Sequence, residues 1–249
     1  MLKTDLLIIF SILTTTIFAQ NSFLGDVLDK NYAQKFKLSK LVVTDSSSAT
    51  NGVLHKSVCI FNEKGLILEK TEFLADKESS KSVYIYDKND NLTDVAFKNG
   101  KGANVGFEKR TYDDKNRLKE VEINFEKGKN ITKEITTWVD DSTKQIDRIA
   151  NGKTVKSVAI FNSKNQPLNE TFEDESATVW KYDAAGKLFF KDEKGVIERY
   201  EFDNANRVTF SENINFNKTF VYDNTGRLTQ IIKIDNNERN SGWEKFEYN

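Results

Sequence analysis

One short pattern of apolar and polar positions recurs along this chain. An aromatic residue is followed by Asp or Asn, two variable residues, a residue that tolerates positive φ, one further residue and an aliphatic residue. Seven clear copies begin at Phe61, Tyr86, Tyr112, Phe161, Tyr182, Phe202 and Tyr222. We interpret Trp138 to Ile146 as a degenerate copy with extra loop residues, and Tyr248-Asn249 as a copy cut off after its first two positions.

Each copy predicts a hairpin turn. The side-chain oxygen at the second position can accept hydrogen bonds from backbone N–H groups two or three residues on, which begins a type I turn. Gly, Asn or Asp at the fifth position tolerates the left-handed conformation that a type I turn followed by a bulge requires. The residues that carry this turn signature are Asn62, Gly65, Asp87, Asp113, Asn116, Asn162, Asp183, Gly186, Asp203, Asn206, Asp223 and Gly226.

The spacing of the copies predicts an all-β chain. Successive aromatics lie between 20 residues (Phe202 to Tyr222) and 26 residues (Tyr86 to Tyr112) apart, room for two strands of about seven residues with two tight turns. Gly-containing segments between the copies predict the return turns. The predicted fold is an antiparallel meander of stacked β-hairpin repeats, of roughly sixteen strands, forming a curved or spiralling sheet that is open or closed.

A second row of aromatic residues precedes the first. Tyr84, Trp180, Tyr200 and Phe220 each stand two residues before a copy and therefore face the same side of their strand as its aromatic. We interpret this face as the packed side of the sheet, because it is the main source of burial. The alternative is an exposed aromatic surface for a ligand, whose candidate residues are Tyr84, Trp138, Trp180, Tyr200, Phe220 and Trp243.

The N-terminal region departs from the pattern. Lys3, the apolar stretch Leu6 to Phe18 and Ala19 predict a signal peptide over residues 1–19, with a short buried helix as the alternative. Residues 20–53 are predicted to form an N-terminal cap with a helix from Phe23 to Tyr32 and a strand at Lys40–Val43. Residues 54–249 form the predicted repeat domain. We therefore expect a secreted, periplasmic or cell-surface protein without a transmembrane helix in its mature chain.

The composition excludes a disordered chain and argues against nucleic-acid binding. With 249 residues, 38% hydrophobic, 12% aromatic and a net charge of −1, the chain is folded and lacks the basic surface that nucleic-acid binding requires. Cys59 is the only cysteine, so no intrachain disulfide is available. One Pro in the whole chain is consistent with many hydrogen-bonded strands.

From about Val58 to Tyr248 the chain resembles the YD-repeat (Rhs-type) family. The segments that carry the resemblance are Arg199 to Val208 and Tyr222 to Leu228, where an aromatic-aspartate pair precedes an Arg and an aliphatic residue. The resemblance implies a long spiralling β-sheet, which in large family members encloses a toxin domain or presents a surface to protein and carbohydrate partners. This chain is shorter than those members, has no distinct C-terminal effector region and ends inside a repeat.

Catalytic and metal signatures are weak. His55 is the sole histidine, Cys59 occupies an aromatic slot as a small core residue, and no His/Cys cluster has zinc spacing. The segment Asp87 to Asn91 has alternating oxygen ligands like a calcium loop, but it matches the other turns position for position. We predict no catalytic residue, no metal and no cofactor.

The leading hypothesis is a non-catalytic secreted or envelope protein that binds an unknown protein or carbohydrate through its sheet. One alternative is an outer-membrane barrel or pore, and a second is a glycan-active hydrolase with a site that the sequence does not reveal. We expect no nucleic-acid partner, and we expect that unpaired sheet edges, if the sheet is open, favour oligomers.

Overall fold

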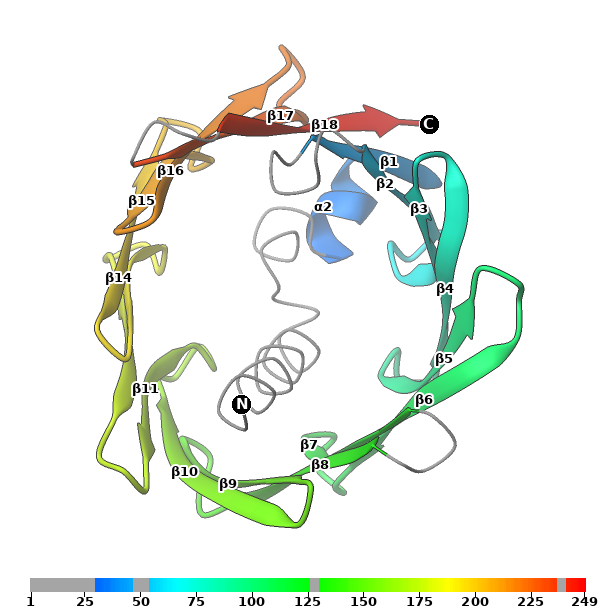
Figure 1. Cartoon of the computed structure of the whole chain (residues 1–249). Helices are drawn as coiled ribbons and strands as arrows, with labels where there is room; N and C mark the ends of the chain where they lie inside the picture. The colour runs from blue at the N-terminus through cyan, green and yellow to red at the C-terminus, as the bar shows by residue number, and fades with distance from the viewer. Residues whose placement is uncertain (1–29, 47–53, 126–129, 237–240) are drawn as a thin grey trace.

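The computed structural model describes residues 30–46, 54–125, 130–236 and 241–249, and their strands form one closed antiparallel barrel (Figure 1). Each strand pairs with the next along the chain and the last pairs with the first, which gives an 18-stranded sheet in this part of the chain. One short helix, α2 (Lys30–Lys35), lies inside the ring. The strands are β1 (Lys40–Ser46), β2 (His55–Phe61), β3 (Ile67–Leu74), β4 (Lys77–Tyr86), β5 (Leu92–Asn99), β6 (Asn104–Tyr112), β7 (Leu118–Phe125), β8 (Asn130–Trp138), β9 (Thr143–Ala150), β10 (Lys153–Phe161), β11 (Pro167–Phe172), β12 (Ala177–Tyr182), β13 (Leu188–Glu193), β14 (Val196–Phe202), β15 (Val208–Asn213), β16 (Phe216–Tyr222), β17 (Leu228–Asp235) and β18 (Ser241–Tyr248).

The predicted turns are confirmed at all seven clear copies. The fifth-position residues have left-handed φ values between 58° at Asn165 and 88° at Gly226. The second-position oxygen accepts backbone N–H groups two and four residues on, as at Asp113 with Lys115 (3.0 Å) and Arg117 (2.8 Å). The second donor lies four residues on because the left-handed residue reverses the chain. Each of these hairpins also carries the predicted bulge, seen as a register shift in the ladder, for example at Tyr112 opposite Leu118.

Successive repeats are locked together through the sixth position and the next aromatic. Arg207 pairs with Asp203 of its own turn (2.6 Å) and lies over the ring of Tyr222 in the next repeat (4.7 Å). The Tyr222 hydroxyl in turn donates to the backbone oxygen of Val208 (2.8 Å). The same stacking of a sixth-position cation on the next aromatic occurs at Arg117–Trp138, Lys187–Phe202 and Arg227–Tyr248. The arginine that follows the turn therefore holds neighbouring hairpins together.

The barrel closes through a ninth repeat that is split between the two ends of the chain. Tyr248 and Asn249 supply its first two positions, and Lys40 and Leu41 supply its sixth and seventh. Tyr248 pairs with Leu41 as each motif aromatic pairs with its seventh-position residue. The Asn249 N–H donates to the Lys40 oxygen at 3.1 Å, which is the bond that Asp113 N–H makes to Arg117 in an intact copy. The strand predicted at Lys40–Val43 is thus confirmed as a wall strand of the barrel.

The motif aromatics face the inside of the barrel. Helix α2 lies inside the ring (Figure 1), and its Ala33 packs in one core cluster with Leu41, Cys59, Phe220 and Phe246, so this face of the wall faces inward. Because directly paired residues share a face, the strand registers extend this assignment around the ring. The interpretation of the aromatic rows as the packed side of the sheet agrees with this placement.

A ring of polar residues, which we call the polar belt, lies on the inner wall four residues before each motif aromatic. It contains the most deeply buried ionic groups of the barrel, such as Glu108 and Glu134, which are 2% and 1% exposed. Buried charges need partners, and the inner wall supplies them: Arg110 pairs with Glu108 and Lys218 with Glu198. The belt consists of Ser57, Ser82, Glu108, Glu134, Ser157, Thr178, Glu198, Lys218 and Glu244.

Two expectations need correction. The described strands number eighteen rather than roughly sixteen, because β1 and β18 form the split repeat. Closure also leaves none of the described strands with an unpaired edge, so association through sheet edges has no site there. The predicted signal peptide, most of the Phe23–Tyr32 helix and residues 47–53 of the predicted cap lie outside the described residues.

Candidate binding cleft at the fourth repeat

The fourth repeat departs from the pattern at its second, fifth and seventh positions. Trp138 pairs with Lys144 just as Tyr112 pairs with Leu118, so this copy has no extra loop residues, contrary to our expectation. Instead it lacks the bulge, because Ser142 stands at the fifth position and does not take a left-handed φ. Val139 replaces the Asp or Asn, and Lys144 replaces the aliphatic residue. Departures from a repeat rule are where a functional site is to be sought.

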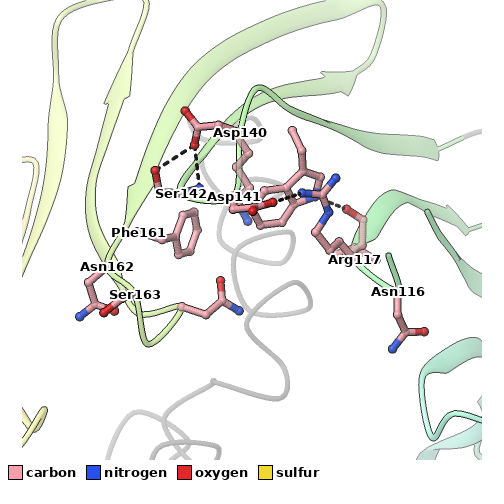
Figure 2. Close-up of a pocket in the computed structure, with 12 residues that line it drawn as sticks. Asn116, Arg117, Asp140, Asp141, Ser142, Phe161, Asn162 and Ser163 are labelled. Atoms are coloured by element: carbon pink, nitrogen blue, oxygen red, sulfur yellow. Dashed lines mark hydrogen bonds and ion pairs between the residues drawn. The ribbon is translucent and has the colours of Figure 1, made fainter. Parts of the chain in front are cut away.

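A cleft of about 710 Å³ opens at this repeat, between the turns of the third, fourth and fifth repeats. We call it the fourth-repeat cleft. Figure 2 shows Arg117 and Asn116 on one side of it and Phe161, Asn162 and Ser163 on the other. Its lining consists of Asn116, Arg117, Leu118, Trp138, Asp140, Asp141, Ser142, Lys144, Phe161, Asn162, Ser163 and Asn165. The volume falls within the range of about 300–1,000 Å³ that small-ligand sites occupy.

Two aromatic rings and two cations form the inner part of the cleft. The rings of Trp138 and Phe161 lie 6.1 Å apart at an angle of 40°. The Arg117 guanidinium lies 4.7 Å from the Trp138 ring, and the Lys144 Nζ lies 4.6 Å from the Phe161 ring. Trp138 Nε1 donates to the Leu118 oxygen at 3.3 Å, which fixes the indole to the preceding repeat. The floor of the cleft therefore combines two aromatic rings with two cations.

The mouth of the cleft carries two carboxylates. Asp140 accepts hydrogen bonds from the backbone N–H (2.7 Å) and the hydroxyl (2.9 Å) of Ser142, and these bonds lower the pKa of its carboxyl. Asp141 is 88% exposed and lies 3.3 Å from Arg117 (Figure 2). It also lies 3.4 Å from Lys115. Both carboxylates are therefore held by groups of the rim.

A buried ionic cluster lies on the inner wall beside the cleft. Arg148 Nη1 donates to Glu170 (2.6 Å) and to Ser157 (2.9 Å), while its Nε lies 3.0 Å from Glu134 without hydrogen-bond alignment. Burial raises the pKa of Glu134, and the attraction of Arg148 opposes that rise. Burial likewise lowers the pKa of Lys144, although Glu134 and Glu170 oppose that change. Lys144 thus connects the cleft to this cluster.

Of the aromatic residues named as candidates from sequence, Trp138 alone lines the cleft among the described residues. Tyr84, Trp180, Tyr200 and Phe220 stand on the inner face of four other strands, where Trp180 and Phe220 are buried in the wall. Trp243 faces the outside, because it lies opposite Ile232 on the face away from Phe246. The structure therefore does not bring the six into one surface. Lys144 was missed because the fourth copy was aligned with extra residues, whereas Phe161 was recognised as the first position of the next copy but not as a site residue.

The other candidates from sequence have structural surroundings. Cys59 is 7% exposed in the core, and burial raises the pKa of its thiol to about 11. His55 begins β2 and is exposed. The oxygens of Asp87 accept hydrogen bonds from the backbone and side chain of Asn91 and so serve the turn. Within the described residues there is no group of His, Cys, Asp and Glu side chains that could hold a metal ion.

No helix among the described residues has the length and apolar character needed to cross a membrane. No protein-family model matches the chain, and neither does any curated protein sequence. No family model therefore supports the resemblance to YD repeats.

Solved structures with similar strand arrangements include a porin-like protein from Bacteroides uniformis. It shares 10% identity with this chain at a TM-score of 0.37, over 85% of this chain and 98% of that one. The TcdB2-TccC3 complex without its hypervariable C-terminal region matches at 12% identity and a TM-score of 0.31, over 74% of this chain but only 14% of its own length. At these TM-scores we draw no functional argument from either protein.

Proposed function

We propose that this chain is a non-catalytic secreted or envelope protein that binds a saccharide in the fourth-repeat cleft. The observation that carries the proposal is the juxtaposition of Trp138 and Phe161 with a ring of exposed amide, hydroxyl and carboxylate groups, at a repeat that departs from the turn rule. Aromatic rings accept the C–H faces of a sugar, while polar groups at the mouth bond its hydroxyls.

The electrostatics of the cleft favour binding over hydrolysis. Glycosidases need one carboxyl group kept protonated as the general acid, near a second that is ionised. In the cleft lining the pKa of Asp140 is lowered rather than raised. The carboxyl with a raised pKa, Glu134, is 1% exposed and lies outside the lining. A binding role therefore fits this geometry better than the hydrolase alternative.

The outer wall of the barrel bears on the membrane alternative. Closure in eighteen strands is compatible with a pore. However, ion pairs lie on the outward face at Lys81–Glu69 (2.8 Å) and Lys133–Glu120 (2.8 Å), and Lys181, Glu201 and Glu247 are exposed on other strands. A lipid-facing band excludes such charges near its centre at a cost of about 2–4 kcal/mol each. We therefore favour a barrel whose outer wall faces water.

A glycan array tests the proposed function. The purified protein should bind at least one class of saccharide, and Trp138→Ala should weaken that binding at least tenfold, about 1.4 kcal/mol. Phe202→Ala is the matched control, because Phe202 also occupies a first position beneath a cation but lies outside the cleft. Its affinity should stay within about twofold of wild type.

A third variant guards against misfolding of Trp138→Ala. Ser163 is exposed at the mouth of the cleft, so Ser163→Leu crowds the entrance with an uncharged side chain and does not change buried packing. It should also lower the affinity. The proposal is refuted if no saccharide on the array binds. It is also refuted if Phe202→Ala and Trp138→Ala lose saccharide affinity equally while circular dichroism shows that both proteins are folded.

A further inference from the structure

Lys144 occupies a position that is apolar in the other repeats of the barrel. It is the seventh-position residue of the fourth repeat and faces inward opposite Trp138. Its equivalents are Ile67, Leu92, Leu118, Pro167, Leu188, Val208, Leu228 and Leu41. A charged side chain at a packed, inward position costs free energy unless a partner compensates it.

The other buried and half-buried cations of the inner wall have such a partner. Lys70, Arg110, Arg148, Lys191, Lys218 and Lys233 each form an ion pair with a carboxylate. Within the part of the chain that the structure describes, Lys144 forms none. Its Nζ lies instead over the faces of Phe161 (4.6 Å) and Trp138 (5.5 Å), at the floor of the cleft.

Charged groups on the neighbouring strands act on Lys144 without forming an ion pair with it. Glu134 on β8 and Glu170 on β11 attract its ammonium, and Arg148 on β9 repels it. Arg148 already pairs with both glutamates. Burial is the largest influence and lowers the pKa of Lys144, so the ammonium is less stable here than in water. An anion placed in the cleft would supply the missing partner.

The carboxylates of the mouth are committed elsewhere. Asp140 accepts from Ser142, and Asp141 lies beside Arg117 and Lys115. Each of these contacts holds the carboxylate at the rim of the turn, where Asp141 is 88% exposed, whereas Lys144 lies on the floor between the two rings. The floor and the mouth therefore offer charges of opposite sign to different parts of one ligand.

We propose that the ligand of the cleft is an acidic saccharide, and that Lys144 binds the carboxylate of a uronic-acid unit whose ring packs on Trp138 and Phe161. This inference rests on the proposed function and names its ligand class. A carboxylate against an ammonium in a partly buried, ring-lined site forms a charge-assisted hydrogen bond, which is stronger than the contact of a neutral ester.

Titration calorimetry with three probes tests the inference. The probes are a galacturonic acid trisaccharide, its methyl ester and a galactose trisaccharide. Wild-type protein should bind the acid at least tenfold more tightly than the ester. Lys144→Met keeps most of the side-chain volume and removes the charge, so it should bind acid and ester equally. Lys181→Met is the matched control on the outer wall and should keep the full preference.

Measurement across pH adds a readout that a packing role for Lys144 would not change. Because its pKa is lowered, the preference for the acid should decline as the pH rises and should do so earlier than for an ordinary lysine, while ester binding stays constant. Equal binding of acid and ester by wild-type protein would overturn the inference and leave the proposed function standing. An unchanged acid preference in Lys144→Met would overturn it as well. If none of the probes and no saccharide on the array binds, the proposed function falls, and the inference with it.

Discussion

Removal of the Tyr248 hydroxyl from the split repeat should lower the free energy of unfolding by an amount that the structure allows us to estimate. This hydroxyl donates to the backbone oxygen of Leu228, a residue with 0% exposure. The Leu228 N–H donates to the Tyr32 hydroxyl at 2.7 Å, and the two tyrosine hydroxyls lie 3.1 Å apart. Since Tyr248 gives its only hydrogen to Leu228, Tyr32 must donate to Tyr248. Three hydrogen bonds thus tie α2, β17 and β18 into one network.

Tyr248→Phe removes two of these bonds, the one that Tyr248 donates to the Leu228 oxygen and the one that the Tyr32 hydroxyl donates to Tyr248. An unsatisfied buried group costs about 1–3 kcal/mol, so the free energy of unfolding should fall by about 2–4 kcal/mol. Tyr222→Phe is the matched control, because its hydroxyl makes a single equivalent bond to Val208 at 2.8 Å. It should cost about 1–2 kcal/mol.

Urea unfolding followed by tryptophan fluorescence measures both changes. A double-mutant cycle with Tyr32→Phe should return a coupling of about 1 kcal/mol between the two tyrosines. The reasoning is wrong if Tyr248→Phe destabilises the protein no more than Tyr222→Phe, or if the coupling is zero.

Three further predictions follow from the turns and the wall. The backbone N–H of each sixth position is the main cause that lowers the pKa values of Asp113, Asp183 and Asp203. Their stabilising contribution is therefore present above the unfolded pKa of about 3.9 and is lost as the pH falls below it. Melting temperatures measured from pH 6 to pH 3 should decline steeply at the acid end, and less steeply in Asp203→Asn. Gly226→Ala should lower the free energy of unfolding in urea by about 1–2 kcal/mol, because the backbone at Gly226 has a φ of 88°. Asn206→Gly, at the equivalent position of the preceding repeat, should change that free energy by less than about 0.5 kcal/mol. The purified protein should stay monodisperse in gel filtration without detergent, because its outward face carries charges on many strands; dependence on detergent would favour the membrane alternative.

The turns could be predicted from sequence because their chemistry is local. Asn or Asp at the second position and Gly, Asn or Asp at the fifth determine a hairpin within seven residues, and the left-handed φ of Asn116 and Gly186 confirms it. The pairing of residues two apart placed both aromatic rows on one face for the same reason. These features depend on neighbours along the chain.

Closure could not be predicted in that way, because Leu41 and Tyr248 are brought together only by the sum of the turns before them. The truncated copy at Tyr248-Asn249 was the available signal, and Lys40-Leu41 supplies the positions it lacks. The polar belt was also visible as a polar residue four before each aromatic, but its burial depends on the curvature of the wall. The cleft was missed because Lys144 did not match the aliphatic rule and was taken as part of a longer loop.

Disulfide trapping at the junction of the chain ends tests the closed nine-repeat barrel most directly. In a Cys59→Ala background, Val42→Cys and Glu247→Cys place two thiols at directly paired positions on the outer wall, within reach of a disulfide. Mild oxidation should link them within one monomer in nearly every molecule, whereas Val42→Cys with Lys245→Cys, two residues out of register, should link poorly. Absence of the first link, or links only between molecules, would contradict closure through a shared repeat.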